Sequence, residues 1–201
     1  MKGKQIIGVI APLGIILTMV PVFQYLAKEF GETLGWYLGF FPYWLIWCGL
    51  FPLWLIGKQR LREIIRPQRL EPKIVLLLAV PIVGAAAYKV VPGLNFAQTD
   101  PWYIVMMVSS VFGNGFFEEV LWRGVYMELF PKNLFIRIFW ASIWFALWHY
   151  APGSVSSDGN VIALIMGSGF FGFYLSFLVK KTNTIWWSIV GHTFGGMIMA
   201  F

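Results

Sequence analysis

Several long stretches of this sequence contain no charged residue, among them residues 6–27, 36–57 and 161–179. Because the hydrocarbon core of a bilayer is about 30 Å thick, an α-helix needs about 20 mainly apolar residues to cross it. Stretches of this length and composition are typical of membrane-spanning helices. They exclude most soluble folds, which cannot cover so much apolar surface.

The composition of the whole chain agrees with this interpretation. Hydrophobic residues make up 59% of the 201 residues and charged residues only 12%, against about 25% charged residues in an average soluble domain. Aromatic residues account for 19%, including 11 Trp, and Trp favours membrane interfaces. We therefore expect an all-α, polytopic membrane helix bundle that forms one integral membrane domain over residues 1–201. The single cysteine, Cys48, lies in an apolar run and is interpreted as a buried hydrophobic residue.

The apolar runs predict about seven transmembrane helices. The first is longer than the apolar core of an ordinary signal peptide and lacks a clear cleavage site, so we expect it to be retained. Proline residues inside these segments (Pro12, Pro42, Pro52 and Pro81) are expected to kink helices, which membrane proteins tolerate. The predicted segments are 6–27, 36–57, 74–91, 102–130, 134–150, 161–179 and 184–201.

The distribution of basic residues predicts the orientation. Lys and Arg gather in cytoplasmic loops of membrane proteins. With the N-terminus in the cytoplasm, the outer side carries only Lys28 and Lys89, and an odd number of spans is required. Residues 58–73 then form the main cytoplasmic loop, which would anchor to lipid headgroups. The twelve basic residues of the inner side are Lys2, Lys4, Lys58, Arg60, Arg62, Arg66, Arg69, Lys73, Lys132, Arg137, Lys180 and Lys181.

Three charged residues fall within six residues of each other in the fourth apolar segment. A charge at the centre of a membrane helix costs about 2.5–3.5 kcal/mol on insertion scales, so such residues are candidates for function. Glu119 and Arg123 are four residues apart, on one helix face, and can form a structural ion pair. Glu118 points about 100° away from Glu119 and needs another partner or a polar cavity. Glu118 is therefore the carboxylate that we expect to face a reaction, with Asn114 and Trp122 on its side of the helix.

The two histidines of the chain fall at a similar predicted depth. His149 ends the fifth segment and His192 lies within the seventh. At a rise of 1.5 Å per residue, Glu118, His149 and His192 lie about 18, 20 and 12 Å from the inner ends of their segments. A glutamate and two histidines on three separate helices at similar depth predict one shared site.

Such a site could hydrolyse an amide without a nucleophilic Ser or Cys. Glu118 could take a proton from water, His149 could hold the water or relay the proton, and His192 could donate a hydrogen bond to the developing oxyanion. Two histidines and one glutamate could also hold zinc, although the His-Glu-x-x-His motif is absent. These residues alone leave metal-free and metal-assisted hydrolysis both open.

At these positions the chain resembles the CPBP family, the CAAX protease and bacteriocin-processing (ABI) family of intramembrane proteases. The family pattern Glu-Glu-x-x-x-Arg matches Glu118 to Arg123, and Phe-x-x-x-His matches Phe145 to His149. The third motif, His-x-x-x-Asn, matches only at His192, because Gly196 stands at the Asn position. The resemblance covers residues 102–201, which would hold the catalytic core.

The resemblance implies an intramembrane endopeptidase that uses a glutamate-activated water. The first Glu and the second-motif His, here Glu118 and His149, would be central, with Glu119 and His192 in the same catalytic set. A metal-free mechanism is favoured and zinc is left open. The implied partners are a membrane-associated peptide or protein substrate and the lipid bilayer, with no nucleic acid, in the plasma membrane of a prokaryote.

Two other functions fit the same residues. Gly196 replaces the Asn of the family motif, and this replacement would suit a non-catalytic relative that binds a peptide or confers bacteriocin immunity. The intramembrane Glu and His residues would also suit a small proton-coupled transporter, although the single charged motif and the lack of an inverted repeat count against it.

Overall fold

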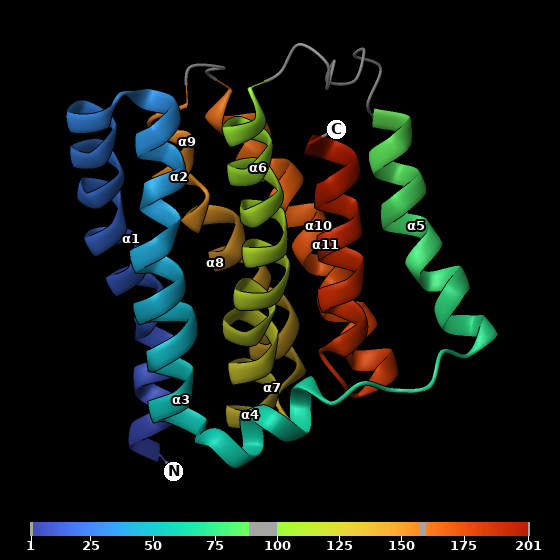
Figure 1. Ribbon diagram of the computed structural model, residues 1–201. Helices are drawn as coiled ribbons and strands as arrows, with labels where there is room; N and C mark the ends of the chain where they lie inside the picture. Colours follow the sequence, from blue (N-terminus) through green and yellow to red (C-terminus); the bar gives the residue numbers. More distant parts are fainter. Residues whose placement is uncertain (1, 89–99, 157–159, 201) are drawn as a thin grey trace.

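The computed structural model of the protein describes residues 2–88, 100–156 and 160–200, and over these residues every regular element is a helix. The all-α prediction is confirmed. Most of the long helices run along a common direction, with the N-terminus and the short α4 at one end of the bundle (Figure 1). The α-helical elements are joined in places by π-helical segments, labelled η. In chain order the elements are α1 (Lys2–Phe30), α2 (Glu32–Pro42), η1 (Tyr43–Leu50), α3 (Phe51–Ile56), α4 (Lys58–Ile65), α5 (Pro72–Tyr88), α6 (Pro101–Gly113), η2 (Asn114–Glu118), η3 (Val120–Val125), α7 (Tyr126–Leu129), η4 (Phe135–Trp140), α8 (Ala141–Trp148), α9 (Tyr150–Gly153), α10 (Val161–Thr182) and α11 (Trp186–Ala200).

Among the described residues, four continuous helices are long and apolar enough to cross a membrane. They are Lys2–Phe30, Glu32–Ile56, Pro101–Leu129 and Val161–Thr182. They contain the first and sixth predicted segments and all but the last residue of the second and the fourth. The integral membrane character of the protein follows from these helices.

The remaining three predicted segments correspond to shorter helices. The described part of α5 has 17 residues and that of α11 has 15, and the 134–150 segment is divided between η4 and α8, with a turn at His149. Residues 89–91, which include Lys89, and residue 201 lie outside the described residues. The count of seven spans and the cytoplasmic N-terminus therefore stay predictions.

Residues 58–73 differ from the predicted loop, because they begin with the helix α4. Leu61, Ile64 and Ile65 recur at helical spacing, and Ile64 is buried against Val120 and Ile185. The cations of α4 stay exposed, and Arg60 forms ion pairs with Glu63 and Glu128. The hydrogen bond from Arg60 to Glu128 raises the pKa of Arg60 above its ordinary value. The first part of this stretch, α4, is therefore an amphipathic helix packed across one end of the bundle (Figure 1).

Two glycines make the tight turns at opposite ends of the second membrane helix. Gly31 (φ 82°) separates α1 from α2, and Gly57 (φ 83°) separates α3 from α4. Glycine adopts positive φ without the steric cost that a Cβ brings. The first turn reverses the chain, so that α1 and α2 pack side by side as a hairpin.

An aromatic core joins this hairpin to α8. Phe23 of α1 packs edge-on against Phe40 of α2 and Trp148 of α8, with ring centroids 5.3 and 6.0 Å apart. Tyr43 of η1 stacks on Trp148 with a centroid distance of 3.7 Å. Cys48 is free and fully buried in the same core, as interpreted from the sequence. These contacts fix Trp148, the residue before His149.

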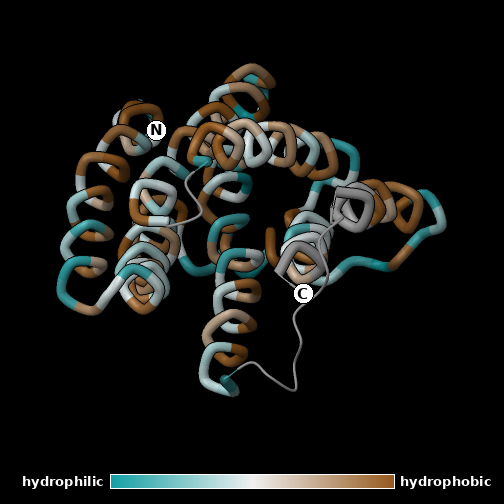
Figure 2. Tube along the Cα trace, turned by 90° about the horizontal axis from the view of Figure 1, so that it is seen from above, coloured by the Kyte–Doolittle hydropathy of each residue, from teal (hydrophilic) through white to brown (hydrophobic). Residues whose placement is uncertain are grey.

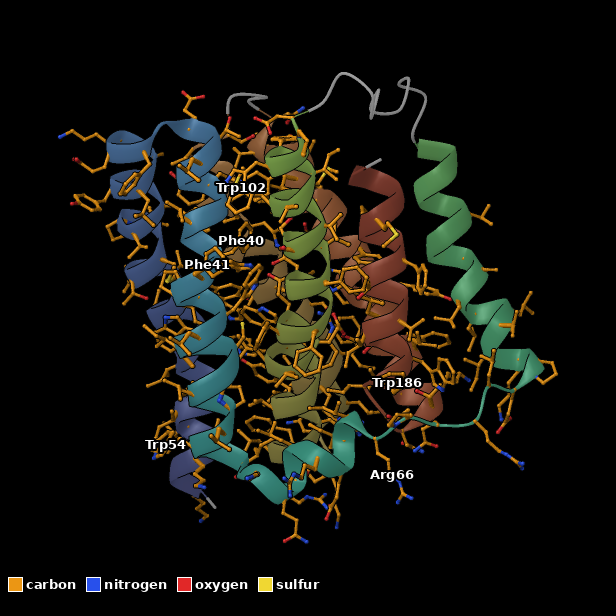
Figure 3. All side chains as sticks on the ribbon, in the orientation of Figure 1. Phe40, Phe41, Trp54, Arg66, Trp102 and Trp186 are labelled. Carbon is orange, nitrogen blue, oxygen red and sulfur yellow. The ribbon has the colours of Figure 1, made fainter. Side chains whose placement is uncertain are left out.

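The outer surface of the bundle is apolar. Large side chains such as Leu17, Leu76 and Phe170 are more than 60% exposed, and hydrophobic residues appear around the bundle seen from above (Figure 2). Exposed Trp54 lies toward the end of the bundle that carries Arg66, and Trp102 lies toward the other end (Figure 3). Apolar sides with Trp near both ends suit a protein surrounded by lipid.

Candidate active site

The two adjacent glutamates sit between two π-helical segments. Glu118 ends η2, Glu119 follows it, and η3 begins at Val120. π-Helical turns are rare and are often found at functional sites. The regular helical spacing assumed from the sequence therefore does not hold on either side of Glu119.

Glu119 forms the buried ion pair with Arg123. Arg123 Nη1 donates to Glu119 Oε1 at 2.8 Å, and both side chains are almost fully buried. Arg123 Nη2 donates to the carbonyl of Gly172 on α10 at 3.1 Å, and the guanidinium lies 4.3 Å from the Phe145 ring centroid. A Cβ at position 172 would approach Phe145 Cδ1 at 2.8 Å. The small residue on α10 therefore leaves room for Arg123 and Phe145.

Glu118 takes a different partner from Glu119. Its Oε1 accepts a hydrogen bond of 2.8 Å from the indole Nε1 of Trp148. Trp148 is fully buried and is held by its stack on Tyr43. One oxygen of Glu118 is thus fixed by α8, while Oε2 faces α11.

His192 on α11 lies against both glutamates. Its Nδ1 is 2.9 Å from Glu119 Oε1, and its Nε2 is 3.7 Å from Glu118 Oε2. The edges of Phe171 and Phe145 flank the imidazole ring. The His192 side chain is 11% exposed, against 1% for Glu118, so the site is nearly closed.

A glycine allows α11 to approach the glutamate helix this closely. A Cβ at Gly115 would lie 2.1 Å from Thr193 Oγ1 and 3.0 Å from Thr193 Cα. Any larger residue at position 115 would push α11 away. Gly115 therefore sets the distance between His192 and the two glutamates.

His149 lies beside this cluster but bonds elsewhere. Its Nδ1 is 2.7 Å from the carbonyl oxygen of Phe145. A carbonyl only accepts, so Nδ1 carries the proton and the neutral ring presents Nε2 as an acceptor. Its ring packs on Phe145, with centroids 4.7 Å apart, and Phe145 also contacts His192. Within the described part of the chain, His149 forms no hydrogen bond or ion pair with either glutamate.

The cluster of Glu118, Glu119, Arg123 and His192 has zero net charge when it holds one proton more than a neutral His192 and two carboxylates carry. Glu119 and Arg123 neutralise each other, and the Glu119 carboxylate accepts from His192 Nδ1–H. A neutral His192 then turns an unprotonated Nε2 toward Glu118 Oε2, where two acceptors would repel. One further proton, on Glu118 or on His192 Nε2, removes this repulsion and leaves the buried cluster with zero net charge. Uncompensated charge is costly in such surroundings.

The described residues contain no group of three or more His, Cys, Asp or Glu side chains arranged to hold a metal ion. Glu118, Glu119 and His192 lie together, but the hydrogen bond to Glu119 occupies His192 Nδ1 and His149 points its Nδ1 at a backbone carbonyl. The described site therefore places the Glu118 carboxylate beside the imidazole of His192.

The structure brings Glu118, Glu119, Arg123 and His192 into direct contact, with His149 one residue beyond Trp148. Sequence reasoning missed Trp148 and Tyr43, because the donor to Glu118 depends on how α8 packs against η1. Trp122 does not serve Glu118 either, since its indole donates to Tyr43 OH at 2.8 Å. In the sequence, the one feature that points to Trp148 is its position directly before His149 of the Phe-x-x-x-His motif.

Two more residues singled out in the sequence lie near the cluster. Asn114 Oδ1 accepts a hydrogen bond of 2.9 Å from Trp44 Nε1, so its amide oxygen is turned toward the N-terminal half. Gly196 is one turn beyond His192 on α11. A Cβ there would meet only Val111 Cγ1, at 3.6 Å, which is ordinary van der Waals contact.

Comparison with known proteins finds a matching family model. Residues 100–198 match the family model described as type II CAAX prenyl endopeptidase Rce1-like. The match contains Glu118, Glu119, Arg123, His149 and His192. No curated protein and no solved structure matches the chain. The paired glutamates, the arginine and both histidines all lie inside the matched residues, and over residues 100–198 the chain is similar to the CPBP family of CAAX-type intramembrane proteases.

Proposed function

We propose that this protein is an intramembrane endopeptidase that hydrolyses a peptide bond with a water molecule activated by Glu118. The observation that carries the proposal is the facing pair of Glu118 Oε2 and His192 Nε2, 3.7 Å apart within the helix bundle. A base and a hydrogen-bond donor at this separation can both reach one water molecule or one carbonyl group.

The reaction needs only groups of the cluster and water. With the further proton on His192, the Glu118 carboxylate takes a proton from water as the water oxygen attacks the peptide carbonyl carbon. His192 Nε2–H donates a hydrogen bond to the oxyanion that forms. The proton on Glu118 then passes to the amide nitrogen, and the C–N bond breaks to give a carboxylic acid and an amine.

Glu119 and Arg123 act as positioning residues in this scheme. Their ion pair holds the Glu119 carboxylate against His192 Nδ1, which fixes the ring with Nε2 toward Glu118. His149 acts through its Nε2, which accepts a hydrogen bond from the attacking water or relays the proton to the leaving amine. The hydrogen bond to the Phe145 carbonyl orients that nitrogen.

The substrate class follows from where the cluster lies. The surface around the bundle is apolar, so a substrate reaches the site from the membrane, as a membrane-associated peptide or protein. Seven spans with a cytoplasmic N-terminus, in the plasma membrane of a prokaryote, are part of the same proposal. It uses no bound metal in the chemical step and involves no nucleic acid.

The test is cleavage of a membrane-associated peptide by the purified protein in liposomes. General base catalysis is worth about 10²–10⁴-fold in rate, so Glu118→Gln should lower cleavage by that factor. His149→Ala should also lower it strongly. Glu63→Gln, an exposed carboxylate on α4, is the matched control and should cleave like the wild type. Retention of cleavage in both Glu118→Gln and His149→Ala would reject the mechanism.

One observation favours a second candidate function. Gly196 removes an amide that the family motif carries, so the site could bind a peptide without cutting it. A non-catalytic immunity protein would protect cells from a bacteriocin equally well with Glu118→Gln. Loss of protection in that variant would count against this second function.

A further inference from the structure

A narrow pocket is lined by three basic side chains, Arg123, Arg137 and Lys180, with Ser176 and Val179 of α10 on one wall. No acidic residue is among its lining residues. We call this the cationic pocket. Arg123 is paired with Glu119, so Arg137 and Lys180 supply the positive charge that attracts an anion.

The innermost cation has an unused donor. Arg123 is buried, and its two terminal nitrogens bond Glu119 and Gly172, but its Nε has no hydrogen-bond partner in the described structure. A buried N–H without a partner costs about 1–3 kcal/mol, so native proteins usually supply one. The cationic pocket is where that partner would lie.

The two outer cations form no ion pair with a neighbouring acid. Arg137 Nη1 donates to the carbonyl of Pro131, and over the described residues neither Arg137 nor Lys180 forms an ion pair. Glu128 of the adjacent α7 is paired with Arg60 at 2.7 Å. The mouth of the pocket therefore presents two cations without an ion-pair partner among the described residues.

The size of the pocket decides how an anion would sit. Its enclosed volume is about 10 Å³, which holds about one water molecule and no larger group. A phosphate therefore lies at the mouth, between Arg137 and Lys180. A single water inside can connect it to Arg123 Nε.

The surface beside the mouth indicates where the phosphate comes from. Phe135 and Phe139 on η4 are 61% and 49% exposed, and Phe177 on α10 is also exposed. The adjacent Lys181 lies over the Phe177 ring, 5.3 Å from its centroid. Apolar rings next to a cationic mouth suit a molecule with both a phosphate and acyl chains.

We propose that the cationic pocket binds the phosphate of an anionic phospholipid, whose acyl chains lie along the exposed phenylalanines of η4 and α10. The predicted topology puts Arg137 and Lys180 on the cytoplasmic side, where anionic lipids attract basic residues. The lipid would reach the Glu119–Arg123 pair through one water molecule. The proposal does not depend on the peptidase activity.

The experiment measures lipid retention and thermal stability of the full chain. Protein in phosphatidylcholine nanodiscs is compared with protein in nanodiscs that also contain phosphatidylglycerol, and retained lipid is counted by native mass spectrometry. Since a cation near the surface contributes about 1 kcal/mol to binding anionic lipid, Lys180→Gln should weaken retention about five-fold. Arg137→Gln with Lys180→Gln should weaken it further and remove the stabilisation by phosphatidylglycerol.

The matched control removes the same charge from outside the pocket. Lys2→Gln with Lys132→Gln takes two exposed cations from the same predicted side and should retain phosphatidylglycerol like the wild type. Equal retention by the pocket variants and the control variant would overturn the proposal. Equal stabilisation of the protein by inorganic phosphate alone would overturn the assignment to a lipid. Lys180→Gln keeps the Arg137–Pro131 hydrogen bond, so it remains informative if the double variant does not fold.

Discussion

The two halves of the chain both form apolar helices, yet they bury different kinds of side chain. In the described residues before 89, the buried side chains are hydrophobic, such as Phe23, Tyr43 and Trp44. The buried polar and charged side chains all follow residue 100. They are Ser110, Glu118, Glu119, Arg123, Ser142, Ser176, Thr184, Ser188 and Thr193.

This contrast separates the groups proposed to react from the side chains that support them. The C-terminal half holds every charge of the site, in the stretch that matches the protease family. The N-terminal half contributes an aromatic wall, in which Tyr43 stacks on Trp148 and Trp44 donates to Asn114. If the division is correct, changes to the charged groups of the site and to their hydrogen-bond donors should alter chemistry and stability together, and changes in the wall should alter stability alone.

The largest effect on stability is expected from Arg123→Met. Removing one partner of a buried ion pair leaves an uncompensated charge, here on Glu119, and costs about 3–5 kcal/mol. Unfolding in detergent with increasing sodium dodecyl sulfate measures the loss. The double variant with Glu119→Gln should recover much of it, because the unpaired charge is gone. Arg66→Met, on an exposed residue, is the control, and an equal loss there would contradict a special role for the buried pair.

A smaller effect is expected from Trp148→Phe. The ring still stacks on Tyr43, but Glu118 Oε1 loses its donor, and a hydrogen bond to a charged group is worth about 1.5–3 kcal/mol. Peptide cleavage should fall as well, since the Glu118 carboxylate is no longer fixed. Trp122→Phe is the matched control, because this equally buried indole donates to Tyr43 and not to a carboxylate. Equal cleavage by the two variants would show that the Trp148 bond does not position Glu118.

The sequence predicted the apolar helices and the charged residues of the C-terminal half, but not how the helices pack against one another. Long uncharged stretches such as 6–27 predict helices because hydropathy and length are local properties. The Glu119–Arg123 contact was predictable for the same reason, since it joins residues four apart. The Trp148–Glu118 bond and the His192–Glu119 contact join residues 30 and 73 apart. They depend on the packing that Gly115 and Gly172 permit, which hydropathy does not encode.

Tyr43→Phe tests whether the aromatic wall of the N-terminal half affects stability alone. This change removes the oxygen that accepts the indole hydrogen bond of the buried Trp122, at a cost of about 1–3 kcal/mol, and keeps the stack on Trp148. Cleavage should stay near the wild-type rate while stability falls. Tyr126→Phe, which removes a hydrogen bond to the carbonyl of Gly8, should behave in the same way. A loss of cleavage in Tyr43→Phe alone would show that the wall takes part in the chemistry.

The smallest effect on stability is expected from Gly196→Asn, which adds a polar group to the half that already holds the charges. The Cβ meets Val111 only at ordinary contact distance, and Asn is a slightly better helix former than Gly, so stability should change by less than about 0.5 kcal/mol. Position 196 is one turn from His192 on α11, so an amide there can add a second donor to the oxyanion. One added hydrogen bond is worth about 0.5–1.5 kcal/mol, or about two- to ten-fold in rate. Gly196→Ala supplies the Cβ without the amide and should cleave like the wild type. Equal rates for the Asn and Ala variants would mean that the side chain at position 196 does not face the reacting carbonyl. His192 would then be the one residue of α11 that donates a hydrogen bond to the oxyanion.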